Sequence, residues 1–430
     1  MKSVLKKIII LILTFEAKLV LKKYNPKIIA VTGSVGKTSA KDAIFDVISG
    51  NFFARKSHKS FNSELGVPLT VLDLPNGWNN PLVWLKNVID GLILVILPNR
   101  YPSWLVLEIG ADRVGDIQSI TNWVKPDIAV VTRMGKVPVH VEFFRSIEEV
   151  LLEKSFIVRG MKRSGMLVLN SDDEDVLKFK ELTDNNTITF GTENPTDVLG
   201  QELSVVYDES DKPKGIKFNV AHDGHVSDIF VDGALGIQQM FPVLAGVSVG
   251  LGAGMSFKEA CKAVKNYKPS SGRMKILKGI KNSTIIDDTY NSSPVATEEA
   301  LSTLKSINPK GRKIAILGDM LELGIYSTES HKIVGKMSAK TTDFLVTVGI
   351  RSRFIAEGAL NAGMDENKIL QFEDPLSAGK EIQNIIEEGD VILVKGSQGS
   401  RMEKVVEEIM AEPNRKGELL VRQDEEWKNR

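Results

Sequence analysis

The sequence predicts an α/β protein of two domains, each built on a mostly parallel sheet, behind a short basic helix. Three observations predict this fold class. From residue 27 onward, short β-branched runs alternate with helical stretches. Because apolar runs separated by helices are typical of parallel strands buried on both faces, they indicate an α/β sheet. Over residues 30–48, a glycine loop joins the first run to a helical stretch. Pro, Ser and Gly cluster at 268–273, which favours a break between domains at that point.

The composition is that of an ordinary globular protein. Of the 430 residues, 42% are hydrophobic and 26% are charged, which excludes a disordered, collagen-like or disulfide-stapled chain. The 55 basic and 55 acidic side chains cancel, so net charge gives no reason to expect a nucleic-acid partner. The one cysteine, Cys261, has no partner for an internal disulfide and fits a reducing compartment.

The first element is a basic amphipathic helix over residues 1–24. Residues 1–23 carry six lysines against Glu16, a net charge of +5, around the apolar run 8–15. A helix that crosses a bilayer needs about 20 apolar residues, so this segment is too short and too charged to span. Two interpretations stand: the helix lies on an anionic membrane surface, or it packs against the protein's own body with its lysines in water.

A second apolar stretch covers residues 81–97. Lys86 and Asp90 interrupt it four residues apart, on one helix face. We expect a helix in the core here. Exposure of both apolar stretches would instead favour a membrane contact.

The remaining elements follow the alternation of strands and helices. A turn-rich, alternating stretch over 200–232 predicts antiparallel strands appended to the first sheet. We place the first domain at 25–272 and the second at 273–430. The strands expected in the two sheets are 27–32, 104–108, 127–132, 166–169 and 187–190, then 284–287, 313–317, 344–348 and 391–394.

The strongest local motif is AVTGSVGKTS over residues 30–39. Glycines let backbone amides curl around a phosphate, and the helix that follows adds positive potential. The lysine of such a loop reaches the outer phosphates and the next hydroxyl ligates Mg²⁺. Strand, loop and helix occur in the required order. The loop therefore predicts a nucleotide phosphate site made by Gly33, Ser34, Gly36, Lys37, Thr38 and Ser39.

This loop resembles that of the Mur ligase superfamily, the ATP-dependent amide-forming enzymes of peptidoglycan synthesis and their folylpolyglutamate relatives. Further stretches resemble successive motifs of the family's central domain: 62–72, 107–110, 115–117 and 125–132. Four later stretches resemble the branch that adds D-alanyl-D-alanine to UDP-muramoyl tripeptide: 271–273, 286–294, 317–324 and 394–403. The resemblance runs from about residue 27 to 406. It implies a central P-loop ATPase domain followed by a Rossmann-like C-terminal domain.

The resemblance also implies the chemistry. An ADP-forming ligase phosphorylates a carboxylate with ATP, and an amine attacks the resulting acyl phosphate. Holding several negative oxygens together calls for a phosphate cradle, cationic side chains and Mg²⁺, of which the family uses two ions. The implied substrates are a UDP-muramoyl peptide and D-Ala-D-Ala. The implied protein is a cytoplasmic monomer. The basic helix, and not the resemblance, leaves open a contact of residues 1–23 with the inner face of the membrane.

The expected catalytic residues are Lys37, Glu108, His140 and Lys154. Glu108 ends an apolar strand, and a carboxylate at the C-terminal edge of a parallel sheet points into the usual ligand crevice. By the resemblance, Mg²⁺ is held by Thr38, Glu108, His140 and a carbamylated Lys154. A carbamate would turn this lysine into an anionic ligand. Without the resemblance, His140 reads as a loop histidine and Lys154 as part of a solvated helix face.

The second domain is expected to complete the site. By the resemblance, Arg273, Asp288, Tyr290 and Asn291 contact the nucleotide. Charged and polar residues at strand ends are candidates for holding the two substrates: Asn62, Arg133, Asp319, Glu322, Lys395, Ser397, Arg401 and Glu403.

The sequence departs from the family pattern in three places. A domain that binds the UDP-sugar precedes the loop in the family, whereas Gly33 here follows only a short helix. A stretch near the adenine reads Gln238, Gln239 and Pro242 in place of His and Asn. Arg133 and Ser63 each replace an expected Asn. These departures leave two alternatives open: the same chemistry on another acceptor, such as a lipid-linked peptide, or a nucleotide-binding scaffold without ligase activity.

Overall fold

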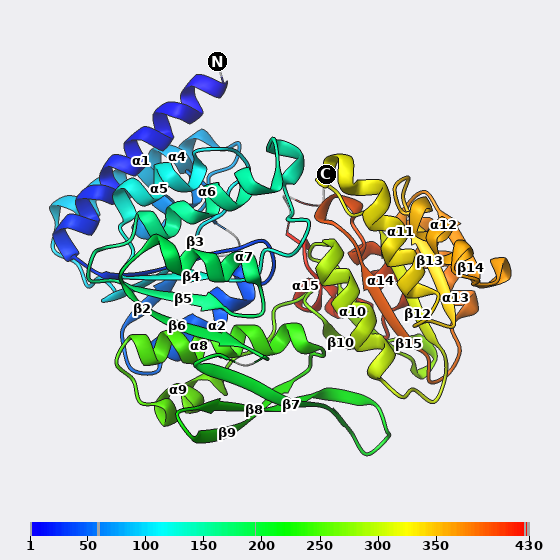
Figure 1. The fold of residues 1–430 in the computed structure, drawn as a ribbon. Helices are drawn as coiled ribbons and strands as arrows, with labels where there is room; N and C mark the ends of the chain where they lie inside the picture. Colours follow the sequence, from blue (N-terminus) through cyan, green and yellow to red (C-terminus); the bar gives the residue numbers. More distant parts are fainter. Residues whose placement is uncertain (1, 58–60, 194, 425–426, 428–430) are drawn as a thin grey trace.

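A computed structural model describes residues 2–57, 61–193, 195–424 and 427 of the chain. It contains two sheets, each flanked by helices and set beside the other, with the N-terminal helix on the outside of the first (Figure 1). The predicted α/β class is confirmed.

The first sheet has nine strands in the order β2-β3-β1-β4-β5-β6-β7-β8-β9. The strands from β2 to β7 are parallel, and β7, β8 and β9 form an antiparallel extension, as the alternation over 200–232 predicts. Their bounds are β1 Lys27–Thr32, β2 Ala54–Lys56, β3 Trp104–Glu108, β4 Ile128–Val131, β5 Met166–Asn170, β6 Asn186–Gly191, β7 Val198–Tyr207, β8 Pro213–His222 and β9 His225–Asp232.

Alternate residues of the central strand β1 point to opposite faces and join two different cores. Ile29 and Val31 pack with helices α2 and α8 on one face. Ile28 and Ala30 pack with α3, α5 and α6 on the other. The helices of this half are α1 Lys2–Tyr24, α2 Lys37–Ser49, α3 Gly66–Leu72, α4 Pro81–Ile96, α5 Asp116–Val124, α6 Ile147–Arg159, α7 Glu174–Leu177, α8 Met240–Gly252 and α9 Phe257–Val264.

The second sheet has six strands in the order β10-β11-β15-β12-β13-β14, all parallel except β10. Its strands are β10 Lys275–Lys278, β11 Thr284–Asp288, β12 Lys313–Gly318, β13 Phe344–Val348, β14 Ile369–Phe372 and β15 Val391–Lys395. Its helices are α10 Pro294–Ser306, α11 Ser327–Ser338, α12 Arg353–Asn361, α13 Pro375–Ile385, α14 Glu403–Ile409 and α15 Lys416–Leu419. The first sheet ends at Asp232 and the second begins at Lys275, while the boundary at residue 272 stays a prediction.

Helix α4 corrects one expectation. The stretch 81–97 forms the predicted helix but does not lie in the core, because only Asn87, Gly91 and Leu94 of α4 are buried. Its other side is open, and Leu82 is 73% exposed. Apolar residues lie on most sides of the helix, so its sequence does not show which side faces the protein. Within the described part of the chain, none of the helices combines the length and apolar run needed to cross a bilayer.

Candidate active site

The phosphate loop lies at the C-terminal edge of the first sheet, between β1 and α2. Gly33 has φ 144°, and a Cβ there would meet Thr132 Oγ1 at 2.0 Å. Gly36 precedes α2 with φ 83°, a left-handed conformation that favours glycine. The amides of Ser34 and Val35 donate to the carbonyl of Arg133 and fix the loop to the strand beside it. These contacts give the backbone the curled form that the motif predicts.

Two lysines meet at this loop. Lys37 Nζ and Lys154 Nζ donate to the same carbonyl oxygen of Gly33, at 2.8 and 2.9 Å. Lys154 is 1% exposed, and burial, followed by the charge of Lys37, holds its pKa well below the usual value. The neighbouring Glu153 does not neutralise it directly, because its carboxylate accepts from the amides of Gly115 and Ile117. Lys154 is therefore a buried amine whose charged form is disfavoured by its surroundings.

Glu108 is the hub of an oxygen-rich cluster beside the loop. Its carboxylate is 1% exposed and accepts from Thr38 Oγ1 at 2.9 Å and Asn62 Nδ2 at 3.1 Å. A carboxylate and a hydroxyl next to a phosphate cradle are the hard oxygen donors that Mg²⁺ prefers. Among the described residues, no three His, Cys, Asp or Glu side chains gather closely enough to hold a metal ion by themselves. The donor set fits an ion held mainly by nucleotide phosphates and water, with few protein ligands.

His140 connects the two domains. Its Nδ1 lies 2.7 Å from Glu322 Oε2 and 3.9 Å from Asp112 Oδ1. The close contact with His140 holds the pKa of Glu322 below its usual value. Both His140 and Glu322 have positive φ, 69° and 64°, a strained conformation for residues with side chains. The predicted metal ligand and the predicted substrate residue therefore face each other across the interdomain cleft.

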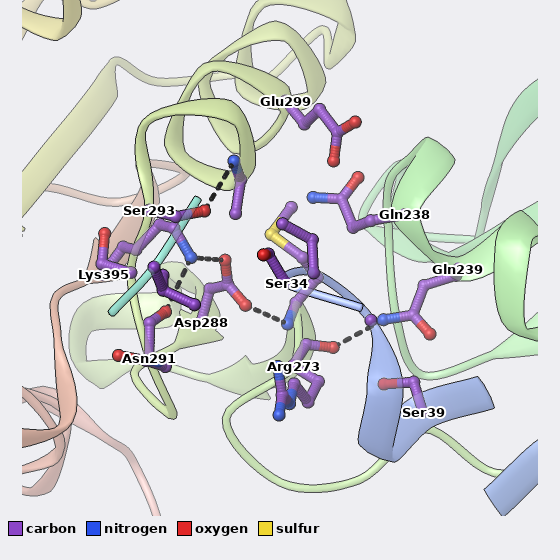
Figure 2. Close-up of a pocket in the computed structure, with 16 residues that line it drawn as sticks. Ser34, Ser39, Gln238, Gln239, Arg273, Asp288, Asn291, Ser293, Glu299 and Lys395 are labelled. Atoms are coloured by element: carbon purple, nitrogen blue, oxygen red, sulfur yellow. Dashed lines mark hydrogen bonds and ion pairs between the residues drawn. The ribbon is translucent and has the colours of Figure 1, made fainter. Parts of the chain in front are cut away.

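A second pocket opens on the other side of the loop. Figure 2 shows Asp288, Asn291 and Lys395 on one side of it and Gln238 and Gln239 on the other. Lys395 Nζ lies 2.5 Å from Asp288 Oδ2 and donates to the carbonyl of Asn291 at 3.0 Å. Gln239 Nε2 donates to the carbonyl of Arg273 at 2.7 Å, which ties the first domain to the start of the second.

Gln238 is the polar group in this pocket that fits a nucleobase. Its amide oxygen and nitrogen are both buried, and neither has a hydrogen-bond partner within the described chain. An unsatisfied buried amide costs free energy unless a ligand supplies its partners. Arg273 lies at the same pocket, with its guanidinium 4.0 Å from the ring centre of Tyr290. The lining fits a planar, hydrogen-bonding group.

Most of the predicted site residues line these two hollows. The interdomain cleft is lined by Ser34, Gly36, Lys37, Thr38, Asn62, Glu108, His140, Arg273, Tyr290, Asn291, Glu322 and Ser397. The pocket of Figure 2 adds Ser39, Asp288 and Lys395.

Other candidates lie outside both hollows. Arg133 forms an ion pair with Glu299 of α10 and covers the ring of Phe241. The carboxylate of Asp319 accepts from the amide of Ser352 at 2.7 Å. Glu403 is 1% exposed and holds Arg401 and, at 2.9 Å, Arg422. These residues have local partners that their place at strand ends did not reveal.

The structure adds residues that the motifs missed. Asp112, Arg113, Val139, Phe143 and Trp427 also line the cleft. Asp112 and Arg113 follow the motif around Glu108 closely in the sequence. Their position at the same sheet edge could therefore have been predicted. Trp427 lies beyond the last motif, and nothing in the sequence marks it.

Comparisons with known proteins show what the chain is similar to. The family description "Mur ligase middle domain" matches residues 91–228, and "Mur ligase, glutamate ligase domain" matches residues 272–398. The chain is 28% identical over 398 residues to the UDP-N-acetylmuramoyl-tripeptide--D-alanyl-D-alanine ligase of Bacillus subtilis, covering 92% of this chain and 79% of that protein. It is 27% identical over 422 residues to the ligase of the same name from Rickettsia prowazekii, with coverages of 93% and 83%.

Solved structures share the fold. The MurF ligase of Thermotoga maritima in complex with ADP superimposes with a TM-score of 0.76 at 24% identity, covering 93% of this chain and 83% of that one. MurF from Acinetobacter baumannii gives 0.75 at 23% identity, with coverages of 92% and 79%. The two matched domains together account for more than half of the chain and include Glu108, His140 and Arg273, whereas the phosphate loop at 33–39 lies outside the matched ranges.

Proposed function

Because the chain belongs to the Mur ligase family and carries its middle and C-terminal domains, we propose that it joins D-alanyl-D-alanine to UDP-N-acetylmuramoyl-tripeptide in peptidoglycan synthesis. The observation that carries the proposal is the gathering of Lys37, Thr38, Glu108 and His140 at one interdomain cleft. The named ligases to which the chain is similar over nine-tenths of its length support this choice of substrates.

The reaction needs two displacement steps, the first at the terminal phosphoryl group of ATP and the second at the acyl carbon of the tripeptide. The tripeptide carboxylate attacks the terminal phosphoryl group of ATP, releasing ADP and forming an acyl phosphate. The amine of D-Ala-D-Ala then attacks the acyl carbon, loses a proton and expels inorganic phosphate. Holding both reactants in one cleft between the domains supplies the proximity that such a step requires.

The roles of the phosphate-loop residues follow from their positions. Lys37 exchanges its contact with the Gly33 carbonyl for the outer phosphates of the nucleotide, and the loop amides bind the phosphate oxygens. Thr38 and Glu108 would hold Mg²⁺, which neutralises charge on the phosphoryl group that is transferred. His140 would add a ligand for a second ion and, through Glu322, hold the two domains together over the cleft.

Lys154 is proposed to act as a carbamate. A neutral amine attacks CO₂ through its nitrogen lone pair and releases one proton, which leaves an anionic carbamate. The burial that lowers the pKa of Lys154 supplies the neutral amine, and the adjacent Lys37 would stabilise the negative product.

The nucleotide base is proposed to bind in the pocket of Figure 2. Gln238 offers both a donor and an acceptor to a purine edge, which suits adenine. Arg273, Tyr290, Asp288 and Asn291 would contact the nucleotide from the second domain. Ser397 and Lys395 remain candidates for positioning the incoming dipeptide.

The cellular setting is also a proposal. We propose a cytoplasmic monomer whose residues 1–23 contact the inner face of the membrane, because α1 exposes lysines on a helix with an apolar stripe. The charge of +5 in this segment suits an anionic surface.

An acceptor panel tests the proposed reaction. The purified protein, with ATP, Mg²⁺ and bicarbonate, is offered UDP-muramoyl tripeptide, a lipid-linked muramoyl tripeptide and tripeptide alone, each with D-Ala-D-Ala. We expect product mass and phosphate release with the UDP-linked acceptor. Preference for the lipid-linked acceptor would replace the proposed substrate while keeping the chemistry. ATP binding without any product would support a scaffold instead.

A further inference from the structure

The outer side of the first domain carries a large apolar surface that the ligase reaction does not use. It consists of residues from two helices and is here called the α1–α4 face: Ile8, Leu11, Ile12, Phe15, Leu82, Leu85, Ile89, Leu92, Ile93, Ile96 and Leu97. Each is at least 37% exposed, and together they make up 11 of the 24 large apolar side chains that the described residues expose. Such a concentration on a soluble fold marks an interaction site.

The apolar residues repeat with the helical period on both elements. On α1 they fall at 8, 11, 12 and 15, and on α4 at 82, 85, 89, 92, 93 and 96. This spacing places each set on one side of its helix. The opposite sides are buried, with Leu13, Ala17 and Val20 of α1 in the core. Each helix therefore has one face on the protein and one apolar face in water.

The two helices form one fixed unit. Lys23 Nζ donates to the carbonyls of Leu94, Val95 and Leu97 at 3.0, 2.9 and 2.6 Å, which caps the end of α4. A Cβ on Gly91 would meet Glu16 Oε2 at 2.2 Å, so the glycine allows the helices to approach closely. Figure 1 shows α1 and α4 next to each other at the outer end of the domain, away from the second domain.

The charged residues around the α1–α4 face indicate which kind of partner it binds. Lys6, Lys7, Lys18 and Lys22 of α1 are exposed, whereas the acidic residue of that helix, Glu16, is buried. On α4, Lys86 pairs with Asp90 at 3.9 Å and adds no net charge. In a symmetric dimer the same lysines would meet each other and repel. A surface that is apolar at the centre and negative at its edge suits this face better.

We propose that the α1–α4 face docks on an anionic lipid bilayer, with the side chains of α4 entering the acyl boundary and the lysines of α1 reaching the headgroups. This inference rests on the membrane contact proposed above for residues 1–23. It extends that contact to α4, because α4 and Leu97 at its end supply seven of the eleven apolar side chains. Amphipathic helices bind in this way when apolar burial and attraction to anionic lipids act together.

Vesicle flotation tests the proposal with the full chain. The probe is vesicles of phosphatidylglycerol and phosphatidylcholine in equal parts, compared with pure phosphatidylcholine. The α4 variant Ile89→Gln, Leu92→Gln, Ile96→Gln keeps good helix formers on exposed positions, and we expect it to lower vesicle binding at least about tenfold. The matched control Ile333→Gln, Ile350→Gln, Leu376→Gln changes three exposed apolar residues of the second domain and should float like the unmodified protein.

A labelled cysteine gives a readout that does not depend on flotation. The native Cys261 is buried, and burial raises its pKa to about 11, so an environment-sensitive fluorophore labels Leu92→Cys selectively. Anionic vesicles should shift its emission to the blue and leave the same label at Ile350→Cys unchanged. An unchanged emission at Leu92→Cys would overturn the proposal.

The outcomes separate this inference from the proposals on which it rests. If the α4 variant floats normally while Lys6→Gln, Lys7→Gln, Lys18→Gln, Lys22→Gln does not, the contact belongs to α1 alone and the α4 role is wrong. If the protein forms dimers that the α4 variant dissolves, a second copy covers the face instead. Ligation of soluble substrates should be unchanged in every variant. A protein that floats normally but does not ligate would count against the proposed reaction and not against the membrane contact.

Discussion

At the scale of single residues, the proposed chemistry rests on Lys154, an amine that the fold has removed from water. Lys154 lies on α6, and its Nζ reaches the carbonyl of Gly33 from a neighbouring element. We expect Lys154→Ala to abolish ligation while ADP binding persists, because the loop that binds phosphate is formed by other residues. Product formation by mass spectrometry and nucleotide binding by calorimetry would measure the two effects.

A chemical rescue distinguishes a metal ligand from a packing residue. Short carboxylates such as acetate should restore part of the activity of Lys154→Ala if they replace a carbamate, and should do nothing for Lys37→Ala. Lys162→Ala, a change at a partly exposed lysine paired with Asp127, serves as a control that keeps full activity. Full ligation by Lys154→Ala without rescue would remove the residue from the proposed metal site.

Glu16 makes a separate prediction about stability. Burial raises its pKa to about 7, above the ordinary 4.5, so its ionised form is disfavoured in the folded protein. Between pH 4.5 and about 7, Glu16 holds its proton in the folded state but loses it in the unfolded state. The free energy of unfolding of the protein therefore falls as the pH rises through this range. At pH 8 the Glu16→Gln variant should be more stable by about 1–3 kcal/mol, with no gain at pH 4.

Denaturant melts at both pH values measure this effect. Glu366→Gln, at an exposed position, is the control and should change stability by less than about 0.5 kcal/mol at either pH. Equal stabilisation by Glu16→Gln at both pH values would show that burial of the charge is not the cause.

At the scale of elements, the phosphate loop gives a comparison of two glycines. A Cβ on Gly33 would overlap Thr132, whereas one on Gly36 would have nothing within 4 Å and would cost only backbone strain. Gly33→Ala should therefore abolish ATP binding and lower the melting temperature. Gly36→Ala should keep the fold at a cost of about 1–2 kcal/mol. Calorimetric ATP titration and thermal melts measure both, and equal effects would contradict this view of the loop.

The elements also show where sequence reasoning succeeds. Strands β1, β3 and β13 have the predicted bounds, because each is a continuous apolar run buried on both faces. The strands β2, β10 and β14 were missed; they are three or four residues long and lie at sheet edges, where no full apolar run is needed. Helix α4 was predicted as a helix but misplaced in the core, since apolar residues lie on most of its sides.

At the scale of the whole molecule, several polar contacts join the two domains. The ion pair of Arg133 with Glu299 and the close contact of His140 with Glu322 both join the first domain to the second. Arg133→Ala should raise the KM for ATP several-fold and increase the radius of gyration, because it loosens the closed arrangement and leaves the partly buried carboxylate of Glu299 without its partner. Kinetics and small-angle scattering measure the change.

The control for domain closure lies at a pair within one domain. Lys332→Ala breaks its pair with Glu357, both in the second domain, and should leave the radius and the KM unchanged. An Arg133→Ala protein with the original radius and KM would show that the pair does not set the domain arrangement.

The arrangement of the two domains limits how much of the site can be predicted from the sequence. The residues from Gly33 to Ser39 and Glu108 could be grouped from the sequence because neighbouring parallel strands end at one edge of a sheet. The pairing of His140 with Glu322 could not, because it depends on how two separately folded sheets are set against each other. Likewise, the sequence brought Arg401 and Glu403 together as candidates but could not show that Glu403 is also held by Arg422.

The measurement that tests the central claim most directly is the mass of the product formed from UDP-muramoyl tripeptide, D-Ala-D-Ala and ATP, with parallel detection of released phosphate. The proposed ligase should give the tripeptide extended by D-Ala-D-Ala, with one phosphate per product, and no phosphate when either substrate is left out. Binding of ATP with neither product nor phosphate, under Mg²⁺ and bicarbonate, would contradict the claim.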